Sequence, residues 1–145
     1  MKKFFMAFAC AMLLLGTAIC SATVDAGKIA LGPVYPGMSV NALIDACGQP
    51  NYRDGDDWIY QDAKVEVERG VVEKIETYSG NLATPAGIRV GQAADALNST
   101  YGSADKIDHD DGAVEYEYYS GDYSKEIEFK VANGVITKIT CKFRD

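Results

Sequence analysis

The sequence predicts an α+β fold built from two tandem copies of one unit, in which a short helix is followed by a three-stranded antiparallel sheet (αβββ). The pattern of residues 37–77 returns, slightly longer, in residues 87–141. In each copy the apolar residues first recur with a helical period and then alternate as in a strand. A copy of about 40–55 residues rarely buries an adequate core alone, so both are expected to fold as one cooperative body.

The first 26 residues have the layout of a secretory signal peptide. Lys2 and Lys3 precede an almost wholly apolar run at 4–19, and small residues follow at 20–22. This three-part layout predicts export, and the run is shorter than the roughly 20 residues of a spanning helix. Cleavage after Ala22 and cleavage after Ala26 are both open.

Cys20 raises an alternative fate for this leader, which is processing as a lipoprotein. Lipoprotein signals have a small residue directly before the cysteine and usually leucine three positions before it. Those places hold Ile19 and Thr17 here. Lipidation of Cys20 is therefore the minority interpretation, and a soluble periplasmic or extracellular protein is the main one.

Two units are expected after the leader: 27–79, which includes an N-terminal arm, and 80–145. Residues 27–35 form that arm, expected as a short edge strand or an extended segment. Pro33 and Pro36 limit it, because proline offers no N–H to a strand ladder.

Each unit is expected to begin with one helix. Ser39 is a candidate N-cap, since its hydroxyl can accept from free N–H groups of the first turn, and Gly48 ends the helix. In the second unit Arg89 holds the cap position, so that helix should begin less sharply, and Gly102 ends it. The apolar stripes are Val40, Leu43, Ile44 and Cys47 in the first helix, and Val90, Ala93 or Ala94, Leu97 and Tyr101 in the second.

The remaining residues of each unit alternate with the period of a half-buried strand. Acidic turns at 54–57 and 108–112 come before the first predicted strands, and Arg69-Gly70 and Asn133-Gly134 are expected hairpin turns with positive φ. One sheet face should pack under the helices while the other stays open. Alternation places Tyr78, Tyr119, Val72 and Ile136 on the open face.

Composition excludes several classes of function. Without residues 1–26 the chain has 12 basic and 20 acidic side chains, a net charge of −8. Such a surface repels phosphate backbones and anionic lipid, so nucleic acid is not an expected partner, and a partner bound through charge should be basic. His109 is the single histidine, in an acidic stretch without a triad, and neither acidic turn matches a calcium-binding loop. We expect no enzymatic activity, no metal and no cofactor.

Two cysteines remain beyond the leader, Cys47 and Cys141, and both fall on predicted core faces. A disulfide between them would join the two units and close a long loop. The alternative is that each is a small buried hydrophobe in the core of its own unit.

The motifs of the first unit resemble the SmpA/BamE-like proteins and the β-lactamase inhibitory protein (BLIP) superfamily. They are Gly37-Met38-Ser39, Gly48-Gln49-Pro50, Trp58-Ile59-Tyr60 and the Gly70-Val71-Val72 strand. The resemblance implies a monomeric, non-enzymatic protein-binding module of the bacterial cell envelope that engages its partner through the open sheet face. Each unit has one cysteine, so the disulfide within each repeat of the inhibitor cannot form here.

Five residues are the candidate partner contacts on the open face: Ile59, Glu76, Tyr78, Tyr119 and Lys138. Tyrosine and aliphatic side chains among charges form a reasonable protein-binding surface. The alternatives are an inhibitor of a secreted hydrolase and a lipoprotein component of envelope assembly, which a lipid on Cys20 would favour.

Overall fold

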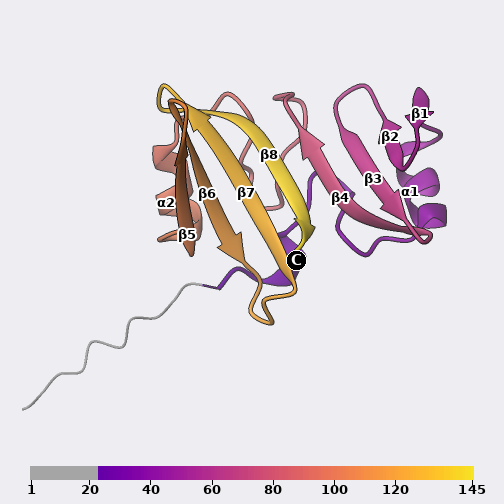
Figure 1. Cartoon of the computed structure of the whole chain (residues 1–145), viewed down its shortest axis with the longest axis horizontal. Coiled ribbons are helices and arrows are strands. Elements are labelled where there is room, and N and C mark those ends of the chain that lie inside the picture. The colour runs from indigo at the N-terminus through magenta and orange to yellow at the C-terminus, as the bar shows by residue number, and fades with distance from the viewer. Residues whose placement is uncertain (1–22) are drawn as a thin grey trace, which may run out of the picture.

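Eight antiparallel strands form one sheet in the computed structural model, which describes residues 23–145 (Figure 1). The order across the sheet is β1-β2-β3-β4-β8-β7-β6-β5. The elements are α1 (Val40–Cys47), β1 (Tyr52–Asp54), β2 (Asp57–Ile59), β3 (Lys64–Glu68), β4 (Val71–Thr77), α2 (Asp95–Tyr101), β5 (Lys106–Asp110), β6 (Ala113–Tyr119), β7 (Lys125–Ala132) and β8 (Val135–Phe143). The α+β class is confirmed, while residues 1–22 of the predicted 1–26 leader, Cys20 included, lie outside the described residues.

Four strands follow each helix, so the predicted αβββ order is wrong by one strand. The additional strands are β1 and β5, the two edges of the sheet. All of their residues are exposed, so neither has the apolar alternation that reveals a half-buried strand. The acidic turns of the prediction are the hairpin connections that join these edges to β2 and β6.

The two halves of the sheet repeat the same contacts. A tyrosine hydroxyl donates to the carbonyl of the glycine that ends each helix, Tyr60 to Gly48 at 3.0 Å and Tyr118 to Gly102 at 3.2 Å. The halves meet where β4 pairs with β8, with Ile75 opposite Cys141. One continuous sheet therefore spans both predicted units.

The segment before each helix pairs with the last strand of its half. Gly37 donates from its N–H to the Val72 carbonyl at 2.7 Å, and Gly91 donates likewise to Ile136 at 2.8 Å. The structural counterpart of Gly37 is therefore Gly91, and the sequence alignment of Gly37 with Gly87 is wrong.

Helix α1 follows the prediction closely. The Ser39 Oγ accepts from the Ala42 N–H at 3.2 Å, and Gly48 ends the helix with φ of 75°. Helix α2 begins only at Asp95, and its N-cap Ala94 makes no side-chain capping bond. The prediction of a weak start for this helix is confirmed, but the N-cap position without a capping side chain is Ala94 and not Arg89.

A β-bulge in each half moves one predicted open-face residue into the core. In β4 the extra residue is Glu73, since Val72 faces Val67 while Lys74 faces Glu66. The matching bulge in β8 puts Ile136 opposite Val131. Both Val72 and Ile136 are completely buried, because one inserted residue reverses the face of everything beyond it.

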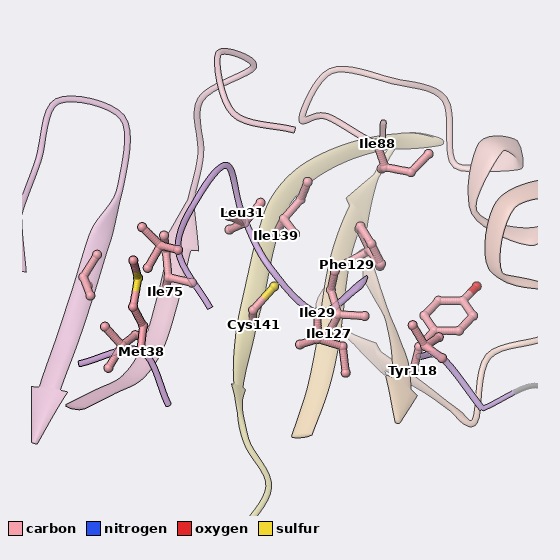
Figure 2. Close-up of a cluster of buried hydrophobic side chains, with 14 of the residues drawn as sticks. Ile29, Leu31, Met38, Ile75, Ile88, Tyr118, Ile127, Phe129, Ile139 and Cys141 are labelled. Carbon is pink, nitrogen blue, oxygen red and sulfur yellow. The ribbon is translucent and has the colours of Figure 1, made fainter. Parts of the chain in front are cut away.

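The N-terminal arm crosses the core face of the sheet between the two helices (Figures 1 and 2). Ile29 and Leu31 are completely buried there, and Val24 donates from its N–H to the Tyr119 carbonyl at 2.9 Å. Both helices are short and lie near the ends of the sheet, so the arm covers the middle strands. The arm is neither an edge strand nor a fully extended segment, because it contains a short 3-10 helix at Ala26–Lys28 and a tight turn between Leu31 and Val34.

Candidate docking surface

The face of the sheet opposite the core is the open face of the prediction, and its charged side chains form ordered rows. One row runs across the strands through neighbouring register positions. Its members are Ile59, Lys64, Glu76, Thr140, Glu128 and Glu117. Lys64 and Glu76 meet along it as opposite charges, a cross-strand pair that stabilises a sheet. Glu128 and Glu117 meet as like charges, which neighbouring lysines offset.

Four of the five predicted contact residues lie together on this face. The Lys138 ammonium is 2.8 Å from a Glu76 carboxylate oxygen and 5.3 Å from the centre of the Tyr78 ring. Ile59, Glu76 and Tyr78 line one open hollow of about 340 Å³. Strand pairing at the β4–β8 junction therefore joins residues that are far apart in the sequence.

Glu76 is the electrostatic centre of this group. It is 9% exposed and receives a second ion pair, from Lys64 at 3.2 Å. Burial alone would raise the pKa of Glu76, but the ammonium groups of Lys138 and Lys64 hold that pKa below its usual value. Glu76 is therefore ionised at neutral pH and holds both lysines, of which Lys138 lies beside the exposed ring of Tyr78.

The fifth predicted residue, Tyr119, does not join the group. Its hydroxyl donates to Glu117 at 2.8 Å, and its ring lies 3.8 Å beneath the Arg144 guanidinium. Burial, followed by the hydrogen bond to Glu117, raises the pKa of Tyr119. Tyr119 thus belongs to the second half of the sheet, away from Tyr78.

A larger hollow of about 860 Å³ opens at the β4–β8 junction, and sequence reasoning missed most of its lining. Lys74 and Lys142 face each other across the junction, each held by glutamates of its own half. Lys74 pairs with Glu66 at 2.6 Å, and Lys142 pairs with Glu128 at 2.7 Å. Glu76 lines both hollows, so they form one continuous surface.

Three glutamates on the open face bring carboxylate oxygens within 4.8 Å of one another: Glu115, Glu117 and Glu128. Glu117 and Glu128 lie directly opposite on β6 and β7. Lys106 offsets the charge of Glu117 at 3.2 Å, and Lys142 offsets that of Glu128. The sequence prediction of no metal site did not anticipate this cluster, since the two strands come into register only through pairing.

Within residues 23–145 both cysteines are free, so the proposed Cys47–Cys141 disulfide is absent. Cys141 is completely buried in β8, and burial raises the pKa of its thiol. Cys47 is exposed at the end of α1, so its predicted place in a core is wrong. Cys47 lies at an exposed helix end and Cys141 lies in the core, so the two thiols are not paired.

His109 lies in the exposed edge strand β5 rather than in a loop. None of the helices in residues 23–145 has the length and apolar character that a membrane crossing requires.

A matched pair of variants tests the electrostatics of the open face. Glu76→Gln should lower the unfolding free energy at pH 7 by about 1–2 kcal/mol, because it removes a charged partner from two lysines. A carboxyl with a lowered folded pKa contributes stability above its unfolded pKa and loses it as the pH falls through the folded pKa. The difference from wild type should therefore shrink between about pH 5 and pH 3 in urea titrations.

Glu126→Gln is the comparison variant, because the pKa of Glu126 is shifted in the opposite direction to that of Glu76. Burial, together with the neighbouring Glu128, raises the pKa of Glu126, so its contribution to stability is present at low pH and lost as the pH rises. Glu126 also pairs with Lys142 and Arg144 at 3.1 Å each. This variant should therefore lose less stability at pH 7 than Glu76→Gln, and its difference from wild type should change in the opposite direction as the pH falls. Equal losses for both variants would contradict the assignment.

Comparison with known proteins adds the fold and nothing finer. No protein-family model and no curated protein matches the chain. Among solved structures, a DUF4309 family protein (YjgB) from Bacillus subtilis superposes with a TM-score of 0.55 at 14% identity, covering 78% of this chain and 83% of its own. An extracellular SCP-domain protein from Bacillus anthracis superposes with a TM-score of 0.55 at 10% identity over 98% of this chain.

The fold is shared with these two bacterial proteins. The match spans 49% of the Bacillus anthracis protein, so the chain corresponds to about half its length. A proposed β-lactamase inhibitor protein from Streptococcus mutans matches at 18% identity, covering 73% of this chain and 83% of its own, with a TM-score of 0.30, a value too low to indicate a shared fold. The resemblance to the BLIP superfamily and to BamE therefore stays a prediction.

Proposed function

We propose that the protein is an exported, non-enzymatic binding module of the bacterial cell envelope that docks a protein partner on the open face. The observation that carries this proposal is that Ile59, Glu76 and Tyr78 line one hollow, while Lys138 contacts both Glu76 and Tyr78 beside it. The ring of Tyr78 is 68% exposed above an ion pair that is already formed. An exposed aromatic side chain beside fixed charges is typical of interface anchors. Because the ion pair already orders the charged side chains, binding costs little further side-chain entropy.

Charge supports a basic partner for this face. The carboxylates of the open face outnumber its ammonium groups, and the whole chain has a net charge of −7. Such a field attracts and orients basic proteins during encounter. In this proposal the protein binds its partner as a monomer, and the units 27–79 and 80–145 each supply half of the docking surface.

Export is supported by the leader pattern and by the fold shared with an extracellular protein. Two other functions fit the same surface: inhibition of a secreted hydrolase, and envelope assembly by a lipoprotein anchored at Cys20. The intact mass of the protein from its native host separates the last from the others. A chain that begins at Cys20 with acyl groups indicates the lipoprotein, whereas a start at Thr23 or Gly27 indicates a soluble module.

Photocross-linking tests the docking surface directly. We expect p-benzoylphenylalanine in place of Tyr78 to capture a discrete envelope or secreted protein, while the same group in place of Ile107, half exposed on the far edge strand, captures none. That captured protein, once purified, should bind Tyr78→Ala and Lys138→Glu at least tenfold more weakly than wild type. Ile107→Ala should bind normally, and equal affinity for all four proteins would refute the proposal.

A further inference from the structure

The turn between β6 and β7 holds Tyr123 in the left-handed region of backbone space, with φ of 59°. Among the described residues other than glycine, three more have positive φ: Arg69, Asp111 and Asn133. Each of them precedes a glycine in a hairpin turn. Tyr123 has no such setting. A bulky aromatic residue is an outlier at this φ, where glycine or asparagine would fit without strain.

Specific contacts maintain this conformation. The Asp122 carboxylate accepts from the Ser120 hydroxyl at 2.7 Å, the Ser124 hydroxyl at 2.8 Å and the Ser124 N–H at 3.0 Å. These bonds, the Ser120 hydroxyl first among them, lower the pKa of Asp122 to about 2. Arg144 donates to the Tyr123 carbonyl at 3.3 Å. The turn therefore presents a tyrosine ring that is 53% exposed and fixed in direction.

Aromatic and cationic side chains lie at and beside this turn, and Arg144 among them pairs with the Glu126 carboxylate at 3.1 Å. We call them the aromatic–cationic pole: Tyr35, Tyr119, Tyr123, Lys125, Phe143 and Arg144. The Arg144 guanidinium lies between the rings of Tyr119 at 3.8 Å and Tyr123 at 5.8 Å. The Lys125 ammonium lies 5.5 Å from the Phe143 ring and 5.9 Å from the Tyr35 ring. Among the ion pairs of residues 23–145, none involves Lys125.

We infer that the aromatic–cationic pole is the anchor of the docking surface, and that it takes a local acidic patch with an apolar pocket for Tyr123 on a partner whose overall charge is basic. This inference rests on the proposed function. Phe143 and Arg144 also line the larger hollow, so a partner seated at the β4–β8 junction reaches the pole. Lys125, with no carboxylate of its own, pairs with one on the partner. Tyrosine and arginine dominate interface anchors, and a ring already held in place loses little entropy on binding.

The variant Tyr123→Gly separates binding from folding, because glycine removes the ring and also the strain at φ of 59°. The probe is the purified protein captured by the cross-linker at position 78, titrated against each variant of the full chain. We expect Tyr123→Gly to bind at least tenfold more weakly while its thermal midpoint stays at or above that of wild type. Tyr123→Phe, which keeps the ring, should bind within threefold of wild type.

Lys125→Glu tests the charge of the partner. It should weaken binding at least tenfold at low salt, and the deficit should shrink at high salt as the repulsion is screened. Normal binding of Tyr123→Gly and Lys125→Glu, alongside weak binding of Tyr78→Ala, overturns this inference and leaves the proposed function intact. Failure to capture any protein at position 78 overturns both. A fall in thermal midpoint for Tyr123→Gly that matches its loss of affinity assigns Tyr123 a structural role instead.

Discussion

Phe129→Ala is expected to lower the unfolding free energy by about 3–5 kcal/mol. Phe129 is completely buried on β7, in the middle of the second half of the sheet. Its ring centre lies 5.4 Å from that of Tyr101 on α2 and 6.0 Å from that of Tyr118 on β6. The substitution therefore removes the ring that joins the helix to the sheet, and the cavity left behind cannot close without moving both partners.

Urea unfolding at pH 7 measures this loss, and Tyr52→Ala is the matched control. Tyr52 is 61% exposed on the edge strand β1, so its removal should change stability by less than about 0.5 kcal/mol. Natural domains are stable by about 5–15 kcal/mol, so Phe129→Ala leaves a marginal fold. A loss below about 1 kcal/mol for Phe129→Ala would show that the aromatic cluster is loosely packed.

The parts of the fold that the sequence predicted are those whose signals are local. Helix α1 is periodic and has Ser39 and Gly48 at its ends, so both ends were predicted correctly. The turns at Arg69-Gly70 and Asn133-Gly134 have the positive φ expected of them. Edge strands β1 and β5 were missed because a strand exposed on both faces has no alternation to detect.

The faces of β4 and β8 could not be read correctly from alternation alone. A bulge adds one residue, and the sequence has no mark that distinguishes the extra residue, Glu73 or Thr137, from its neighbours. Only pairing with β3 and β7 decides the register. This is why Val72 and Ile136 were assigned to the wrong face.

The docking surface depends even more on distant pairing. Contact between Glu76 and Lys138 follows from the junction of β4 with β8, which joins segments about 60 residues apart. Sequence reasoning found both residues by their faces but could not place Tyr119 apart from them. The conformation of Tyr123 has no sequence signal at all, since tyrosine rarely adopts positive φ.

A chain that begins at Gly32 is expected not to fold, whereas one that begins at Thr23 folds fully. The deleted segment carries Val24, Ile29 and Leu31, all buried against the sheet. Burying each of these side chains stabilises a protein by about 1.5–3 kcal/mol, so their combined loss is comparable with the whole stability of a typical domain. No other described segment can replace the arm over the middle strands, because α1 and α2 lie near the ends of the sheet (Figure 1).

A chain that begins at Gly27 is the informative intermediate, since it corresponds to the second candidate cleavage site. It loses Val24 with its bond to the Tyr119 carbonyl, and also Asp25, which caps the short 3-10 helix at Ala26–Lys28, while Ile29 and Leu31 remain. We expect it to fold with about 2–3 kcal/mol less stability than the chain from Thr23, measured by urea unfolding of the three chains side by side. Equal stability of the Thr23 and Gly27 chains would show that Val24 adds nothing, and cleavage after Ala26 would then be as compatible with the fold as cleavage after Ala22. The expected order instead favours a mature chain that keeps Val24, because its burial and its bond to the Tyr119 carbonyl attach the arm to the end of β6.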